Sequence, residues 1–109
     1  MSEQEDLRIA RTESLFRDVN ERIAESAGRF GSDAAFVCEC DDASCTHRIA
    51  TSIEAYEEVR ADGAQFIVTD DHINDDVERV VERNDDFTLV EKVKPLVRET
   101  VLDLDPRAA

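Results

Sequence analysis

The chain has 109 residues, which suits a single domain with a small core. Charged residues make up 37% of it, aromatic residues only 6%, and the formal net charge is −14. This charge disfavours binding to nucleic acids or to anionic membranes, because both are bound through clustered Lys and Arg. We therefore expect no nucleic acid and no membrane among its partners.

Residues 1–30 are predicted to form one long amphipathic helix. An apolar residue recurs every seven positions, at Ile9, Phe16, Ile23 and Phe30, as on one side of an α-helix. The same side also carries Leu15, Val19 and Ala27. The other side is charged, with Arg11, Glu13, Asp18, Glu21 and Glu25. The apolar side could pack on a sheet of the same domain, or it could bind a partner or a second copy of the chain.

The middle of the chain predicts a β-hairpin, a second helix and a further strand. Residues 34–38 and 48–51 are short runs that suit two strands joined by a turn. Thr51 with Glu54 three positions later forms a capping box, which predicts a helix that extends to Arg60. The segment from Gln65 to Thr69 is aromatic and β-branched and is predicted as a strand.

The last third predicts a second hairpin and a C-terminal tail. Residues 77–83 and 87–93 are rich in valine and are joined by the turn-forming segment 84–86. Residues 76–83 could instead form a short helix capped by Asp75 or Asp76. We expect an α+β domain over residues 1–95, with the long helix packed on a small antiparallel sheet. Residues 96–109 are expected to be a tail, either a short helix or disordered.

All three cysteines of the chain lie close together, at Cys38, Cys40 and Cys45. Because side chains alternate along an extended segment, Cys38 and Cys40 project from the same face. Thiolates and a histidine together form the tetrahedral donor set that zinc prefers. We therefore predict a zinc knuckle on the first hairpin, completed by one of the two histidines of the chain.

The two histidines are rival candidates for the fourth ligand. His47 lies one residue beyond Cys45 on the returning arm of the turn, so a site made of local residues alone is feasible. His72 follows the strand predicted at residues 65–69, and a loop at a strand end can reach a knuckle at the end of a neighbouring strand. Three nearby carboxylates could accept the proton of its other ring nitrogen, namely those of Asp70, Asp71 and Asp75.

Several segments carry a resemblance to a known group of proteins: residues 11–23, 36–40 with Cys45, 56–60, 66–68 with His72, 80–83 and 90–92. Together they resemble a family of short, uncharacterised bacterial proteins, mostly of actinobacterial type. In that family a Gly-His pair follows the third strand, so the resemblance implies His72 as the fourth ligand. This chain has Asp71 where that glycine would be. The resemblance implies no established activity.

Other interpretations of the cysteines stay open. The three thiols could be free, or they could hold a [2Fe–2S] cluster with a histidine. Iron–sulfur proteins of the Cys-Asp-Gly-Ser-His type also begin with Cys-x-Cys, but their third cysteine lies farther away and their Asp-Gly before the histidine is missing here.

The segments that would indicate an enzyme or a secreted protein are missing from the sequence. It contains no HExxH motif, no zinc-deaminase signature and no apolar signal segment, so we expect a cytoplasmic protein without catalytic activity. The predicted function is that of a zinc-stabilised protein-interaction module. Its partner would be another protein, one with a basic surface, and a homodimer is compatible with the apolar side of the helix. A thiol redox sensor that releases zinc on oxidation is the alternative.

Overall fold

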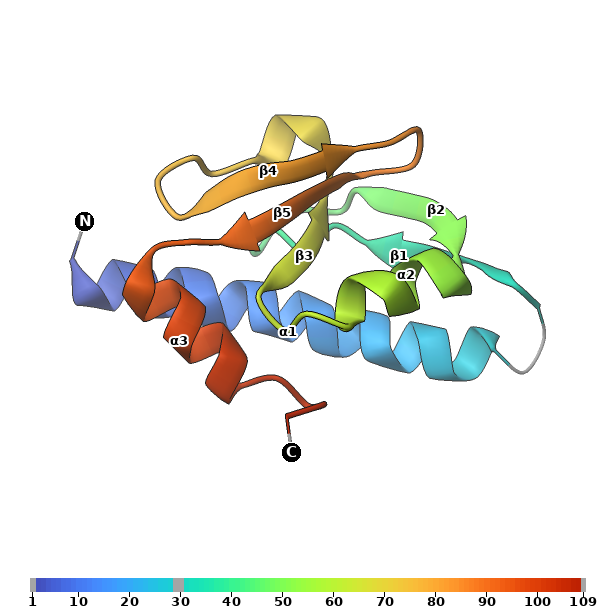
Figure 1. Ribbon diagram of the computed structural model, residues 1–109, viewed down its shortest axis with the longest axis horizontal. Helices are drawn as coiled ribbons and strands as arrows, with labels where there is room; N and C mark the ends of the chain where they lie inside the picture. The colour runs from blue at the N-terminus through green and yellow to red at the C-terminus, as the bar shows by residue number, and fades with distance from the viewer. Residues whose placement is uncertain (1, 29–30, 109) are drawn as a thin grey trace.

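The computed structural model of the protein describes residues 2–28 and 31–108 and has the expected α+β class (Figure 1). In this view a long N-terminal helix runs across the lower part of the molecule, the strands lie above it, and the C-terminal helix descends past its N-terminal half. In chain order the elements are α1 (Glu3–Ala27), β1 (Asp33–Val37), β2 (Arg48–Ser52), α2 (Ile53–Arg60), β3 (Gln65–Val68), the 3-10 turn η1 (Asp70–His72), β4 (Glu78–Arg83), β5 (Thr88–Lys92) and α3 (Pro95–Asp103).

The strands form two small antiparallel sheets. β1 pairs with β2, and the other three strands have the order β3-β5-β4. The two sheets meet just after β1, where the Glu39 N–H donates to the Ile67 carbonyl of β3 at 2.8 Å. The second hairpin is confirmed, and β4 is a strand rather than the alternative short helix. A register shift between Val80 and Glu82 marks a bulge in β4.

The predicted N-terminal helix is confirmed, but the prediction of its buried face is only partly correct: Ile9 lies in the core and Ile23 packs against it, as predicted. Leu15 is 64% exposed and Val19 is 37% exposed, whereas Glu13 is fully buried. The buried residues follow the helical period of 3.6 and are Asp6, Ile9, Ala10, Glu13, Ser14, Arg17, Asn20 and Ala24. Four of the five buried polar side chains meet a partner from a distant segment: Asp6 meets Lys94, Glu13 meets Lys92, Arg17 donates to the Gly63 and Val101 carbonyls, and Asn20 bonds to Val37. Phe30, predicted on the apolar side, lies outside the described residues.

The second helix begins one residue later than predicted. Ser52, rather than Thr51, caps α2, since the Ser52 hydroxyl accepts a hydrogen bond from the Ala55 N–H at 3.0 Å. The Thr51 hydroxyl instead donates to Asp86 at 2.8 Å. This bond ties the end of β2 to the turn between β4 and β5.

The C-terminal segment forms a helix that packs on α1. Pro95 occupies the first turn of α3, where its missing N–H costs nothing. Val97 and Val101 are fully buried in the same core as β3 and β5. Of the two alternatives for this segment, the structure has the short helix, over Pro95–Asp103. No helix among the described residues is both long enough and apolar enough to cross a membrane.

A buried ion cluster, made of Glu13, Glu78 and Lys92, joins α1 to the three-stranded sheet. The Lys92 ammonium lies 2.6 Å from the Glu13 carboxylate and also donates to Glu78. All three side chains are at most 1% exposed. Burial raises the pKa of Glu13 to about 8, although the Lys92 charge acts in the opposite direction.

Candidate metal centre

Four side chains from two loops come together at one end of β1 and β3. Cys38 and Cys40 follow β1, Cys45 lies in the turn before β2, and His72 ends the short turn η1 after β3. One donor atom from each lies within 4.8 Å of all the others. Cys38 and Cys40 are buried, whereas Cys45 and His72 are partly exposed. We refer to these four residues as the thiol–histidine cluster.

The imidazole of His72 presents its Nδ1 atom to the three sulfur atoms. This nitrogen lies 3.3 Å from the Sγ of Cys40, 3.3 Å from the Sγ of Cys45 and 4.0 Å from the Sγ of Cys38. Thiolate and imidazole are both ligands for transition metals. The arrangement can therefore bind a metal ion through three sulfur atoms and one nitrogen.

The turn between the cysteines is shaped by Asp42. Its carboxylate accepts hydrogen bonds from the Ser44 N–H at 2.9 Å and the Ser44 hydroxyl at 2.7 Å. Its carbonyl accepts the N–H of Cys45 at 2.9 Å. Such an Asx turn reverses the chain without a glycine. It returns Cys45 to the side of Cys40, and the Cys38 N–H closes the base of the loop on the His47 carbonyl at 3.2 Å.

The electrostatics of the cluster favour a bound cation. A hydrogen bond from the Cys40 thiol, assisted by the Thr69 N–H at 3.3 Å, lowers the pKa of Cys38. The same bond to Cys38, together with burial, raises the pKa of Cys40, and burial raises that of Cys45. Three adjacent thiols therefore do not all ionise readily without a compensating charge. A divalent cation would supply that charge and release the protons.

The second histidine lies outside the thiol–histidine cluster. His47 is exposed, and its ring centroid is 4.6 Å from that of His72 at an angle of 44°. The structure thus places His72, and not His47, among the sulfur atoms. Of the three carboxylates considered for its other nitrogen, Asp71 is the one beside it, 3.9 Å from Nε2. Asp70 instead pairs with Arg83 at 2.9 Å.

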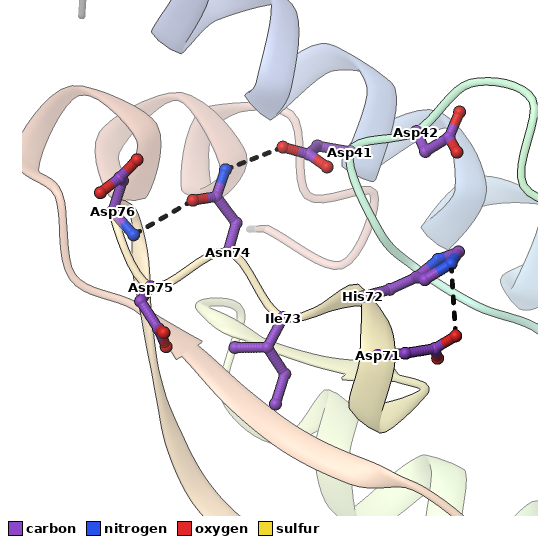
Figure 2. Close-up of a pocket in the computed structure, with 8 residues that line it drawn as sticks. All are labelled: Asp41, Asp42, Asp71, His72, Ile73, Asn74, Asp75 and Asp76. Carbon is purple, nitrogen blue, oxygen red and sulfur yellow. Dashed lines mark hydrogen bonds and ion pairs between the residues drawn. The ribbon is translucent and has the colours of Figure 1, made fainter.

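An acidic groove of about 410 Å³ borders the cluster. Figure 2 shows its walls, which come from the cysteine loop and from the loop after β3. They are formed by Asp41, Asp42, Asp71, His72, Ile73, Asn74, Asp75 and Asp76.

Asn74 joins the two walls of the groove, because its side chain donates to the Asp41 carboxylate at 2.9 Å. Its own N–H donates to Glu78 at 3.1 Å. A turn asparagine is common in any loop, so no sequence signal distinguished this residue. Asn74 thus connects the groove to the buried ion cluster.

Comparisons of the chain with protein-family models, with characterised proteins and with solved structures gave no match. A function for this chain is therefore inferred from the geometry of the site.

Proposed function

We propose that this protein is a non-catalytic module that zinc stabilises and that binds another protein through a basic surface of that partner. The observation that carries the proposal is the convergence of three sulfur atoms and one imidazole nitrogen within 4.8 Å. Three cysteines and one histidine form a common donor set of structural zinc sites.

The distances within the cluster support zinc as the ion. A tetrahedral zinc with sulfur at about 2.3 Å and nitrogen at about 2.0 Å separates those ligands by about 3.5 Å. The three sulfur-to-Nδ1 distances of 3.3, 3.3 and 4.0 Å bracket this value. Four protein ligands would leave no open coordination position for a substrate or a reactive water, which supports a non-catalytic role.

Metal analysis of protein purified without an affinity tag tests the zinc site. We expect about one zinc per chain, and we expect chelation to lower the melting temperature, since metal bound only by the folded state stabilises that state. Protein that contains iron and absorbs visible light would indicate an iron–sulfur cluster instead. Protein with no metal and an unchanged melting curve after chelation would contradict the proposal.

The acidic groove supports a partner with basic character. It concentrates aspartates beside the cluster, and the whole chain carries a net charge of −14. Asp75 and Asp76 are exposed at the mouth of the groove, so their carboxylates are accessible to Lys or Arg of a partner. Binding the metal would fix the shape of this surface, because His72 contributes to both the cluster and the groove.

A charge-matched pair of variants tests the groove. Asp75→Asn/Asp76→Asn removes two charges from the groove, and Glu54→Gln/Glu58→Gln removes two from the exposed side of α2. The probe is a peptide rich in Arg and Lys, titrated at physiological salt. The groove variant should weaken binding by about tenfold, since two rim contacts contribute about 1–2 kcal/mol together. Equal weakening by both variants would show that only net charge matters.

A second candidate, a thiol redox sensor, is favoured by the partial exposure of Cys45 beside two buried cysteines. The Cys45 thiolate would attack a hydroperoxide, break its O–O bond and become a sulfenic acid, and the hydroxide or alkoxide released would take a proton from solvent. Attack by a neighbouring thiolate would then form a disulfide and release hydroxide. Under this candidate, zinc leaves at low peroxide concentration while the far-ultraviolet circular dichroism stays unchanged. A purely structural site releases zinc only as the fold is lost.

A further inference from the structure

Glu39 lies between two of the sulfur ligands in sequence, yet its side chain points the other way and is fully buried. Its backbone N–H donates to the Ile67 carbonyl at 2.8 Å, and the Ile67 N–H donates to its Oε1 at 3.0 Å. Glu39 thus binds both polar groups of one residue in β3. The segment that carries Cys38 and Cys40 is fastened to the three-stranded sheet at its midpoint.

Asn20 fastens the same segment to α1. Its Nδ2 donates to the Val37 carbonyl and to the Oε2 of Glu39, both at 2.9 Å, and its Oδ1 accepts the Val37 N–H at 2.8 Å. The side chain is fully buried. The two bonds to Val37 determine which way the amide faces, so one N–H of Nδ2 necessarily points at Glu39.

We propose that Asn20 and Glu39 are positioning residues of the metal centre, which hold Cys38 and Cys40 in place before an ion binds. This inference rests on the proposed zinc site and adds the residues that determine its affinity. The bonds fix the backbone from Val37 to Glu39 on both sides, so ordering of the first two ligands is part of folding and not of metal binding. The Thr69 N–H bond to the Cys38 sulfur extends the same support.

The hydrogen-bond pattern requires a carboxylate at position 39. Both of its side-chain oxygens accept an N–H, from Ile67 and from Asn20. Glutamine has only one acceptor oxygen. In Glu39→Gln, one orientation of the new amide loses the bond from the Ile67 N–H, and the other turns its NH₂ group toward the Asn20 NH₂ group. Rotation of the Asn20 amide would relieve that clash but would break both bonds to Val37. Either outcome loosens the segment that carries the ligands.

Zinc affinity, measured by competition with a chromophoric chelator, tests the proposal. Glu39→Gln should bind zinc about 10–100-fold more weakly, the usual effect of losing a group that supports a ligand. Its cobalt-substituted form should show weaker visible bands of tetrahedral sulfur coordination. Adding Asn20→Asp should restore only part of the affinity. The new carboxylate can accept both the side-chain amide introduced by Glu39→Gln and the Val37 N–H, but the Val37 carbonyl loses the donor that Asn20 supplies.

Glu13→Gln provides the matched control. It makes the same chemical change at another fully buried glutamate, one that shares no hydrogen-bond partner with Glu39. Its zinc affinity should stay within about twofold of the wild type, because Lys92 stays paired with Glu78, the member of the ion cluster that Asn74 contacts, and sites without shared partners act independently. Wild-type affinity in Glu39→Gln, or an equal loss in Glu13→Gln, would overturn the proposal.

Amide hydrogen exchange on the wild-type protein tests the same proposal even if Glu39→Gln does not fold. After chelation the N–H groups of Val37 and Ile67 should stay protected, whereas that of Cys45 should exchange faster. Loss of protection at all three would show that the metal, and not Asn20 and Glu39, orders the segment. A wild type that binds no zinc would refute both proposals. Tight wild-type binding with an unaffected Glu39→Gln would refute only this one.

Discussion

The thiol–histidine cluster and the buried ion cluster both join distant parts of the chain, but they do so with different chemistry. The thiol–histidine cluster is partly exposed, and as the proposed zinc site it would need a cation from solution to balance its thiolates. The ion cluster is fully buried and contains its own cation, the Lys92 ammonium, which also lies 4.9 Å from the centre of the Phe66 ring. Under the proposed function the first cluster would form fully only with metal bound, whereas the ion cluster is complete within the fold itself.

The two clusters are connected through Asn74, which bonds to Glu78 of the ion cluster and to Asp41 of the groove wall. Asn74 lies two residues beyond His72, so the ion cluster restrains the loop that delivers the imidazole. Loss of metal should therefore loosen the groove while the ion cluster stays intact. Loss of the ion cluster should disturb both regions. Substitutions in each cluster separate these effects.

The largest effect is expected from Lys92→Met, which keeps an unbranched side chain one atom shorter and removes its charge. Glu13 and Glu78 would remain buried without their common partner. Breaking a buried ion pair from one side costs about 3–5 kcal/mol of the free energy of unfolding. Urea denaturation of the zinc-loaded protein, with and without the substitution, measures this cost.

A triple variant provides the control for Lys92→Met. Adding Glu13→Gln and Glu78→Gln removes the stranded carboxylates and should recover most of the lost stability, since neutral replacements of a buried ion group are often tolerated. If Lys92→Met lowers the free energy of unfolding by less than about 1 kcal/mol, the ion cluster contributes no more than a weak surface ion pair. It would also remove the contrast between the two clusters.

The next largest effect separates the two histidines. His72→Ala removes the nitrogen that lies 3.3 Å from two sulfur atoms, whereas His47→Ala removes an exposed ring outside the cluster. His72→Ala should weaken zinc binding by more than about 100-fold, beyond the usual loss for a supporting residue. His47→Ala should have an effect of less than about tenfold, and competition with a chelator measures both.

A larger loss of zinc affinity in His47→Ala than in His72→Ala would identify His47 as the ligand and His72 as its neighbour. Equal losses would indicate that either imidazole can complete the site. In both cases the stability of the ion cluster in metal-free protein should not change, because neither histidine contacts Lys92, Glu13 or Glu78.

The sequence was sufficient to predict features that depend on neighbouring residues. The strands, the helices and the proximity of Cys38, Cys40 and Cys45 follow from local periodicity and spacing. The choice between His47 and His72 depended on where the end of β3 lies, so spacing alone left it open. That β3 lies beside the cysteine segment is a tertiary fact, made by the Glu39–Ile67 bonds.

The ion cluster and the Asn20–Glu39 pair could not be predicted in the same way. Glu13, Arg17 and Asn20 are residue types that usually face solvent, so the helix pattern assigned the buried face to Leu15 and Val19 instead. Their partners lie far along the chain: Glu13, for example, is separated from Lys92 by 79 positions. A buried charge is tolerated only where the fold brings a partner into contact with it. The periodicity of a single sequence does not say which distant residues come into contact.

The last comparison concerns the pH dependence of stability, measured as a slope, and again distinguishes the two clusters. Burial raises the pKa of Glu13 to about 8 in the folded protein, from a value near 4.5. A carboxyl with a raised pKa stabilises the fold while it is protonated, and this contribution is lost as the pH rises through the folded pKa. The loss is at most about 1.4 kcal/mol per pH unit for one proton.

Glu13→Gln removes this titration and leaves Lys92 paired with Glu78. Between pH 5 and pH 8, a window set by the two pKa values of Glu13, its free energy of unfolding should therefore decline less steeply than that of the wild type. Urea denaturation at several pH values in this window measures the two slopes. Protons released by the thiols on metal binding contribute equally to both proteins, since the substitution leaves the thiol–histidine cluster unchanged. Any difference in slope thus belongs to the ion cluster, and parallel curves would show that Glu13 stays ionised beside Lys92 throughout.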